Sequence, residues 1–275
     1  MSSVGPQQGW EAMFKFVVPI AAGAAILAGA AMPAAAADLY EPPVVEYVPP
    51  EPVYGGWYLR GHIGMTNQRV DELYNVLFDN FTDANNFQVV DKNFESGPLF
   101  GAGVGYQFND YLRVDGIVEY RGEVGFHGLD TWTDGGLDRF NNYTGKKSEW
   151  LLMANAYADL GDFNGIVPYV GAGIGASRNT IHSFRDAGID PFGAPTLAYA
   201  DSESEWNLAW ALHAGVGFKA TERMTIDLGY SFMNLGDARS GDIIAYDGTN
   251  LIDNPMEFRK ITSHDFKLGV RYAFN

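Results

Sequence analysis

Apolar and polar residues alternate along most of this sequence, and the alternation has a period of two. Between positions 57 and 274 it forms eight runs of ten to fifteen residues each. Successive side chains of a β-strand point to opposite faces of its sheet, so each run predicts a strand with one apolar and one polar face. The runs cover residues 57–66, 99–108, 111–121, 147–160, 166–177, 205–219, 223–233 and 264–274.

The connections between these runs alternate between long and short. The short ones span residues 109–110, 161–165 and 220–222. The long ones span residues 67–97, 122–146, 178–204 and 236–259. Short turns at one end and long loops at the other are typical of outer-membrane barrels. The pattern therefore predicts an all-β fold, an eight-stranded antiparallel up-and-down transmembrane β-barrel with four long extracellular loops and short periplasmic turns.

The two faces of the runs also differ in bulk, which indicates which face points outward. The apolar face carries most of the Trp, Tyr and Phe side chains, whereas the polar face is rich in glycine, as at Gly101, Gly103 and Gly105. The interior of an eight-stranded barrel holds little more than the side chains that fill it. An outer face in lipid accepts any bulk. We therefore expect the apolar face to point outward and the polar face to line the lumen.

Composition narrows the class of protein further. The 33 glycines and the 14% of aromatic residues suit a narrow barrel with aromatic girdles. The chain has no cysteine, which excludes disulfides and cysteine–zinc sites. A net charge of −16 argues against a nucleic-acid partner, because nucleic-acid-binding proteins are basic.

The N-terminal region predicts export. Residues 14–31 form an apolar run with Lys15 near its start, and an Ala-Ala-Ala sequence at 35–37 follows. A basic residue, an apolar stretch and an A-x-A site make up a secretory signal. We expect a cleaved signal peptide at 1–37, a proline-rich periplasmic linker at 38–55, a barrel at 56–275, and localisation in the outer membrane of a Gram-negative bacterium.

Four segments carry a family resemblance. They are Ala-Asp-Leu-Tyr at 37–40, Gly-Gly-Trp-Tyr-Leu-Arg-Gly at 55–61, Gly-Ala-Gly-Val-Gly-Tyr-Gln-Phe at 101–108 and Lys-Leu-Gly-Val-Arg-Tyr-Ala-Phe at 267–274. The chain resembles the small porin-like outer-membrane immunogenic proteins of alphaproteobacteria. The resemblance implies an outer-membrane β-barrel with exposed loops, in contact with membrane lipids and lipopolysaccharide. It implies no single activity.

The closing strand has the alternation that the barrel-assembly machinery recognises, which makes that machinery an expected partner during biogenesis. The chain departs from the family pattern by ending in Asn275 rather than in an aromatic residue. The predicted assembly signal is therefore displaced by one residue and consists of Phe266, Leu268, Val270, Tyr272 and Phe274.

Charged side chains on the polar face form the best-defined candidate site. Unpaired charges in a narrow interior are costly, so we expect cations and anions to pair there and to close the lumen. A narrow path for ions or small solutes is the alternative. The predicted lumen network consists of Arg60, His62, Arg113, Asp115, Glu119, Arg121, Glu149, His213, Asp227, Asp265, Lys267 and Arg271.

Other motifs predict no catalytic or cofactor site. The spaced glycines lie inside strands, whereas a phosphate-binding loop opens a helix. The adjacent pairs Ser263–His264 and His182–Ser183 should point to opposite faces of their strands. The acidic residues of the first long connection do not match the ligand order of an EF-hand. We therefore expect neither enzymatic activity nor a bound cofactor.

The sequence favours a structural surface protein that contributes to envelope integrity. A narrow porin for small solutes is the second hypothesis, and a surface module that binds heme, a divalent cation or a host ligand is the third. The oligomeric state is left open. An aromatic girdle is expected at the periplasmic rim and a second one, with Trp150, Trp206 and Phe232, at the outer rim. The expected periplasmic girdle consists of Trp57, Tyr58, Phe108, Tyr111, Phe218 and Phe274.

Overall fold

The computed structural model describes residues 55–190 and 192–274. The predicted signal peptide and nearly all of the predicted linker lie outside the described residues. Within the described part of the chain, no helix is long and apolar enough to cross a membrane.

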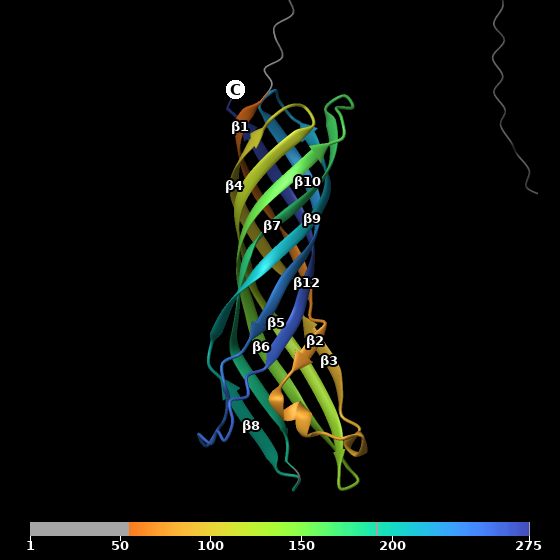
Figure 1. Ribbon diagram of the computed structural model, residues 1–275, viewed down its shortest axis with the longest axis vertical. Helices are drawn as coiled ribbons and strands as arrows, with labels where there is room; N and C mark the ends of the chain where they lie inside the picture. The colour runs from red at the N-terminus through yellow and green to blue at the C-terminus, as the bar shows by residue number, and fades with distance from the viewer. Residues whose placement is uncertain (1–54, 191, 275) are drawn as a thin grey trace, which may run out of the picture. The chain divides into compact units, whose positions relative to one another are not determined.

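Eight long antiparallel strands close into a barrel (Figure 1). Each is hydrogen-bonded to the next, and the last of them, β12, pairs with β1 from Tyr58–Ala273 to Arg69–Thr262. Closure leaves no free sheet edge in the half of the barrel nearest the short connections. The barrel strands are β1 (Gly56–Arg69), β4 (Gly97–Gln107), β5 (Leu112–Asp134), β6 (Leu137–Asp159), β7 (Ile166–Ile189), β9 (Glu203–Lys219), β10 (Met224–Arg239) and β12 (Glu257–Ala273).

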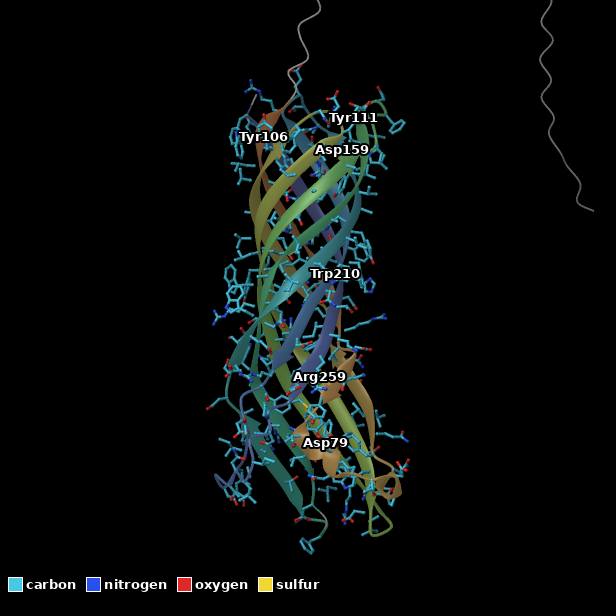
Figure 2. The ribbon with its side chains drawn as sticks, viewed as in Figure 1. Asp79, Tyr106, Tyr111, Asp159, Trp210 and Arg259 are labelled. Carbon is cyan, nitrogen blue, oxygen red and sulfur yellow. The ribbon has the colours of Figure 1, made fainter. Side chains whose placement is uncertain are left out.

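The barrel has a turn end and a loop end. The short connections and the C-terminus lie at the turn end, at the top of Figure 1, and the remaining elements lie toward the loop end. Figure 2 shows Tyr106, Tyr111 and Asp159 near the turn end, and Arg259 and Asp79 in the opposite half. The elements toward the loop end are β2 (Glu72–Tyr74), β3 (Gln88–Phe94), β8 (Pro195–Ala200), β11 (Ile243–Ala245) and the short 3-10 helices η1 (Val76–Asn80) and η2 (Asp83–Asn85).

An apolar belt surrounds the half of the barrel nearest the turn end. Its outward side chains run from Leu112 to Tyr120 on β5 and from Trp150 to Ala158 on β6. Nine residues of a tilted strand are enough to cross a hydrocarbon core. The belt is therefore as tall as a bilayer needs, and β5 and β6 continue well beyond it.

The long connections are not loops throughout, which corrects the sequence-based expectation. Residues 122–146 continue β5 and β6 as a hairpin that turns at Gly135 and Gly136, both with positive φ as a tight two-residue turn requires. Residues 178–204 extend β7 and add β8. These residues were expected to be loops because the alternation of apolar and polar residues shifts by one position above the belt, although the backbone pairing continues there.

The change of phase occurs at β-bulges. The register shifts between Arg121 and Val124 on β5, and near Ser183, Gly236 and Lys260, which all have positive φ, on β7, β10 and β12. A bulge inserts one extra residue and so exchanges the inward and outward faces of the strand that follows. Below the bulges, even-numbered residues face the lumen on β1 and odd-numbered residues face it on the other seven barrel strands. Above the bulges, even-numbered residues of the bulged strands, such as Phe126, Phe184 and Phe258, face inward.

The half of the barrel toward the loop end therefore has an apolar core. Phe94, Phe126 and Phe258 meet with ring centroids 4.7 to 5.7 Å apart. Phe184 packs on Tyr143 and on Phe258. The interior of this half resembles that of a water-soluble barrel, whereas the interior within the belt is polar.

Candidate functional site in the barrel lumen

All twelve residues of the predicted lumen network face the interior within the belt. Nine are buried side chains at inward positions of their strands. Arg60, His213 and Lys267 are half-buried. The closed ring of strands and the strand register bring these residues together from distant parts of the sequence.

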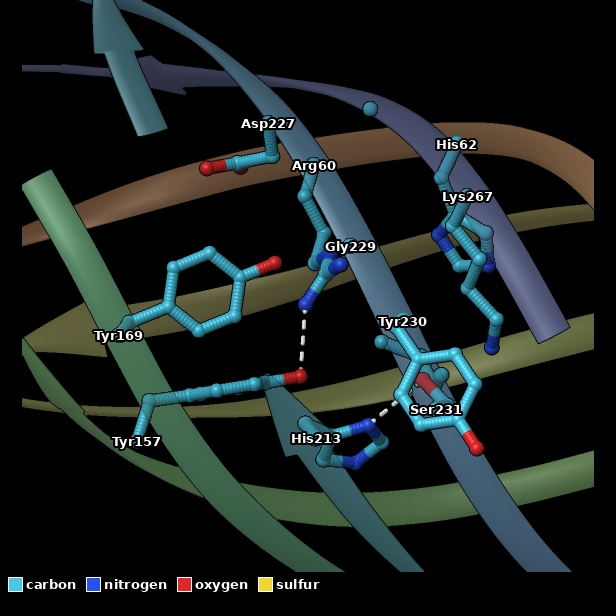
Figure 3. Close-up of a pocket in the computed structure, with 12 residues that line it drawn as sticks. Arg60, His62, Tyr157, Tyr169, His213, Asp227, Gly229, Tyr230, Ser231 and Lys267 are labelled. Carbon is cyan, nitrogen blue, oxygen red and sulfur yellow. Dashed lines mark hydrogen bonds between the residues drawn. The ribbon is translucent and has the colours of Figure 1, made fainter. Parts of the chain in front are cut away.

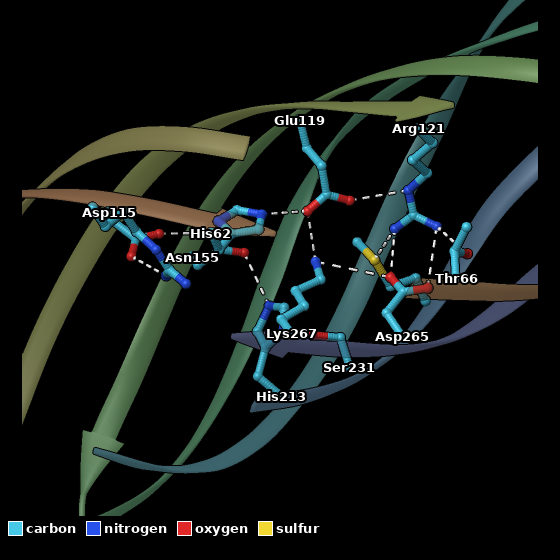
Figure 4. Close-up of polar contacts among 12 residues, drawn as sticks. His62, Thr66, Asp115, Glu119, Arg121, Asn155, His213, Ser231, Asp265 and Lys267 are labelled. Carbon is cyan, nitrogen blue, oxygen red and sulfur yellow. Dashed lines mark hydrogen bonds and ion pairs between the residues drawn. The ribbon is translucent and has the colours of Figure 1, made fainter. Parts of the chain in front are cut away.

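Glu119, Arg121 and Asp265 form the centre of the network (Figure 4). Glu119 accepts from Lys267 Nζ at 2.6 Å and from Arg121 Nε at 3.0 Å, and His62 Nε2 lies 2.7 Å from it. Arg121 Nη2 donates to Asp265 at 2.6 Å. Each buried charge thus has at least one partner of opposite sign, which a low-dielectric interior requires.

A second cluster lies nearer the turn end. Arg60 Nη1 donates to Asp115 at 2.7 Å and to the Tyr157 hydroxyl at 2.8 Å. Asn155 Nδ2 donates to the other carboxylate oxygen of Asp115 at 2.8 Å. His213 joins this cluster, with Nε2 lying 3.1 Å from Asn155 Oδ1. Asp115 therefore links side chains from β1, β5, β6 and β9.

Two arginines lie near the mouth of the lumen at the turn end. Arg271 binds Asp227 through two hydrogen bonds, of 2.7 and 3.0 Å. Arg113 Nε donates to Asp159 at 3.1 Å, and its guanidinium lies 4.0 Å from the ring centre of Tyr157. A guanidinium that is both paired and stacked on an aromatic face is held in place.

Sequence reasoning missed several members of this network. Lys147 is buried and donates to Glu149 at 2.6 Å and to Gln68 at 2.9 Å. Asp159 is the partner of Arg113. Both lie at inward positions of the fourth predicted strand, so the parity of the alternation was the signal that could have identified them.

Tyr58 does not belong to the periplasmic aromatic girdle, where the sequence placed it. Its side chain is buried in the lumen and donates to Asp115 at 3.1 Å. The prediction ignored parity, since Tyr58 lies between the outward Trp57 and Leu59. The other five expected members of this girdle are exposed on the barrel surface.

Within the belt, the charges of the described lumen residues balance. Little space is left around Arg60 and Lys267, whereas pockets of about 420 and 390 Å³ open at the turn end beside Arg271. Six cations face six anions: Arg60, Arg113, Arg121, Lys147, Lys267 and Arg271 against Asp115, Glu119, Glu149, Asp159, Asp227 and Asp265. The cavity among Arg60, His213 and Lys267 measures about 20 Å³, room for about one water molecule (Figure 3).

Lumen glycines make this packing possible. A Cβ atom at Gly101 would lie 2.3 Å from the His62 ring, and one at Gly105 would lie 2.2 Å from the Tyr58 ring. The inward positions of β4 therefore need residues without a side chain because large rings from β1 cover them.

The two adjacent Ser–His pairs have different geometries. Ser263 lies in the lumen beside Arg121, whereas His264 contacts the Tyr230 hydroxyl. The expectation of opposite faces is wrong for the other pair, because Ser183 sits at a bulge with φ of +54° and its Oγ lies 3.4 Å from His182 Nδ1.

His182 also lies 3.3 Å from Glu123, a carboxylate that Lys146 binds as well. All these side chains are at least partly exposed, and the arrangement is that of a surface ion-pair cluster. Among the described residues, no three His, Asp or Glu side chains are grouped as metal ligands.

Four residues of the predicted assembly signal lie on the outer face of β12, Phe274 follows the last residue of that strand, and all five are exposed. They point away from the lumen, at alternate positions between the buried Asp265 and the turn end. Their role in recognition by the assembly machinery stays a prediction.

Comparison with known proteins places the chain among outer-membrane barrels. The family model "Outer membrane protein beta-barrel domain" matches residues 22–274. An uncharacterised protein of Brucella suis is 31% identical over 279 residues, covering 88% of this chain and 93% of that protein. The outer membrane protein PagN of Salmonella typhimurium is 29% identical over 188 residues, covering 64% of this chain and 73% of PagN.

Among solved structures, Neisserial surface protein A is similar over 80% of this chain and 97% of its own, with 16% identity and a TM-score of 0.45. The chain described here is a β-barrel of the bacterial outer membrane, where such proteins lie among lipids and lipopolysaccharide. Because the family model spans nearly the whole described barrel, the chain belongs to the outer membrane protein beta-barrel domain family.

Proposed function

We propose that this protein is a structural barrel whose lumen is closed and that contributes to the integrity of the outer membrane. The observation that carries the proposal is the balanced network of six inward-facing cations and six inward-facing anions, with a cavity of about 20 Å³ at its centre. A hydrated ion needs a continuous path several water molecules wide. The network supports a rigid plug instead.

The same proposal assigns no catalytic centre to the chain. The described lumen residues that could act as acid or base are each held by an ion pair or a hydrogen bond, as Glu119 and Asp265 are. Recognition by the barrel-assembly machinery, through the outward residues of β12, and cleavage of a signal peptide at 1–37 are parts of the proposal.

The test is conductance in a planar bilayer. The purified protein, refolded in detergent, should run as two bands on a gel with and without boiling, as folded barrels do, and should then produce no current steps in the bilayer. Discrete current steps from the heat-modifiable protein would overturn the closed-lumen proposal in favour of a narrow porin. Loss of the gene should sensitise cells to detergent, and unchanged resistance would contradict the role in envelope integrity.

A further inference from the structure

The turn end of the barrel contains a polar hollow, which we call the vestibule. It consists of two adjoining pockets of about 420 and 390 Å³, a size typical of pockets that bind small molecules. Toward the lumen it reaches Arg271, which Asp227 binds, and the buried Tyr58. Both pockets are lined by Gln107, Asp110, Lys219, Thr225 and Arg271.

Three exposed charges of the vestibule, Asp110, Glu222 and Arg223, make no ion pair with the residues that the structure describes. Asp110 lies in the turn between β4 and β5, whereas Glu222 and Arg223 lie in the turn between β9 and β10. Two strands separate these turns in either direction around the ring: β1 and β12 on one side, β6 and β7 on the other. Unpaired charges of opposite sign therefore lie on opposite sides of one pocket.

Hydrogen bonds hold both turns in shape. The Asn109 side chain accepts from the backbone N–H groups of Tyr111 and Leu112, at 2.9 and 2.8 Å. The Thr221 hydroxyl accepts from the N–H groups of Arg223 and Met224, at 3.3 and 3.0 Å. The backbone on either side of the vestibule is thus ordered before a ligand arrives, which lowers the entropic cost of binding.

The other charges around the vestibule are already compensated. Lys219 Nζ lies 2.6 Å from Asp162, and Asp159 accepts from Arg113 at 3.1 Å. The unpaired set is therefore two carboxylates and one guanidinium. A complementary ligand carries two cations and one carboxylate, with polar groups between them.

We propose that the vestibule binds a short peptide that has free termini and ends in a basic residue. Asp110 holds the terminal ammonium, while Arg223 binds the terminal carboxylate and the neighbouring Glu222 binds the basic side chain. Gln107 and Thr225 offer an amide and a hydroxyl to the peptide groups. Because short turns of outer-membrane barrels are periplasmic, the peptide enters from the periplasm.

The test uses the full protein refolded in detergent and titrated with the tripeptide Gly-Gly-Lys in a calorimeter. N-acetylation, C-terminal amidation and replacement of the lysine by methionine each remove one charge from the peptide. Each change should raise the dissociation constant about fivefold, the upper value for one partly exposed ion pair. Because binding is measured without a bilayer, the result does not depend on whether the lumen conducts.

Three variants assign each charge to its partner. Asp110→Asn should abolish the effect of acetylation alone, Arg223→Gln that of amidation alone, and Glu222→Gln that of methionine alone. Arg185→Gln is the control, because this exposed cation of β7 lies toward the loop end, and it should preserve all three effects. A heat-modifiable band confirms that each variant has folded. Absence of saturable binding, or variants that all respond alike to the three peptide changes, would overturn the proposal.

Discussion

At the scale of single residues, the Arg271–Asp227 pair shows how the lumen is stabilised. Both side chains are buried and joined by two hydrogen bonds. Burying two charges costs desolvation free energy, and their mutual attraction repays it only while both are present. Removing one partner therefore leaves an uncompensated charge in a narrow interior.

Asp227→Leu should lower the free energy of unfolding by about 3–5 kcal/mol, because Arg271 then stays buried without a partner. The measurement is urea-induced unfolding of the barrel in lipid vesicles. Asp162→Leu is the matched control: Asp162 pairs with Lys219 at 2.6 Å, but both side chains are about half exposed, so the loss should stay below about 1 kcal/mol. Equal losses in the two variants would contradict a buried ion-pair plug.

Above the belt, two buried carboxyls introduce a dependence on pH. Asp130 accepts hydrogen bonds from the Tyr143 hydroxyl and from the backbone N–H of Asn141. Asp186 pairs in register with Tyr143, and one of its oxygens is buried without a hydrogen bond in the described structure. Burial raises the pKa of Asp130 to about 6, and burial together with the charge of Asp130 raises the pKa of Asp186 to about 7.

These raised pKa values predict that the half toward the loop end is more stable at low pH. Below about pH 4 both carboxyls are protonated in the folded and the unfolded chain. Between pH 4 and 7 the unfolded chain ionises first, so stability is lost as the pH rises through the folded-state pKa values. Hydrogen exchange of residues 124–147, corrected for its intrinsic pH dependence, should be slower at pH 5 than at pH 8.

The matched variants separate this effect from a general one. Asp186→Asn should reduce the pH dependence of exchange, whereas Asp138→Asn, which changes an exposed carboxyl on the β5–β6 hairpin, should preserve it. Exchange that is equally fast at both pH values in the native protein would mean that ionisation of the two carboxyls does not lower the stability of the folded chain.

At the scale of elements, the β-bulges decide which side chains are inside. They lie near the level where the apolar belt ends, on β5, β7, β10 and β12. One extra residue in each strand moves large apolar side chains from the outer face, where lipid surrounds them, to the inner face, where they form a core. The bulges thus allow the same strands to face lipid in one half of the barrel and water in the other.

Deleting Lys260 should remove the bulge of β12 and turn Phe258 and Met256 outward, into water. The half toward the loop end should become sensitive to trypsin, while the belt half still gives a heat-modifiable band. Deletion of Leu251, an exposed residue of the connection before β12, is the control and should leave protease resistance intact. If protease resistance survives both deletions, the bulge is not needed to keep Phe258 and Met256 inside the barrel.

Periodicity predicted the belt half of each strand well, because lipid on one side and ion pairs on the other impose strict alternation. It placed all twelve predicted lumen residues on the inner face. It failed for Tyr58, where the alternation of inward and outward positions was not applied. It also failed where a bulge exchanges the inward and outward faces, because the residue type does not mark a bulge: Ser183 and Lys260 have positive φ without being glycine. The apolar core around Phe126 and Phe258 was consequently assigned to loops.

At the scale of the whole molecule, the barrel has two halves. One half faces lipid and has a polar interior, and the other faces water and has an apolar interior. The two share continuous strands, such as the 23 residues of β5, so neither half can move as a separate domain. Stability of the lumen network and order of the outer half are coupled through the same backbone hydrogen bonds.

The length of the outer hairpin has a consequence for reach. From the bulge of β5 to its tip, Gly122 to Gly135, the strand covers thirteen steps, which at about 3.3 Å per residue and a tilt of about 40° raise the tip by about 30 Å. That height is comparable to the thickness of the hydrocarbon core itself. The tip of this hairpin therefore lies about as far above the belt as the belt is tall, well beyond the level of the lipid headgroups.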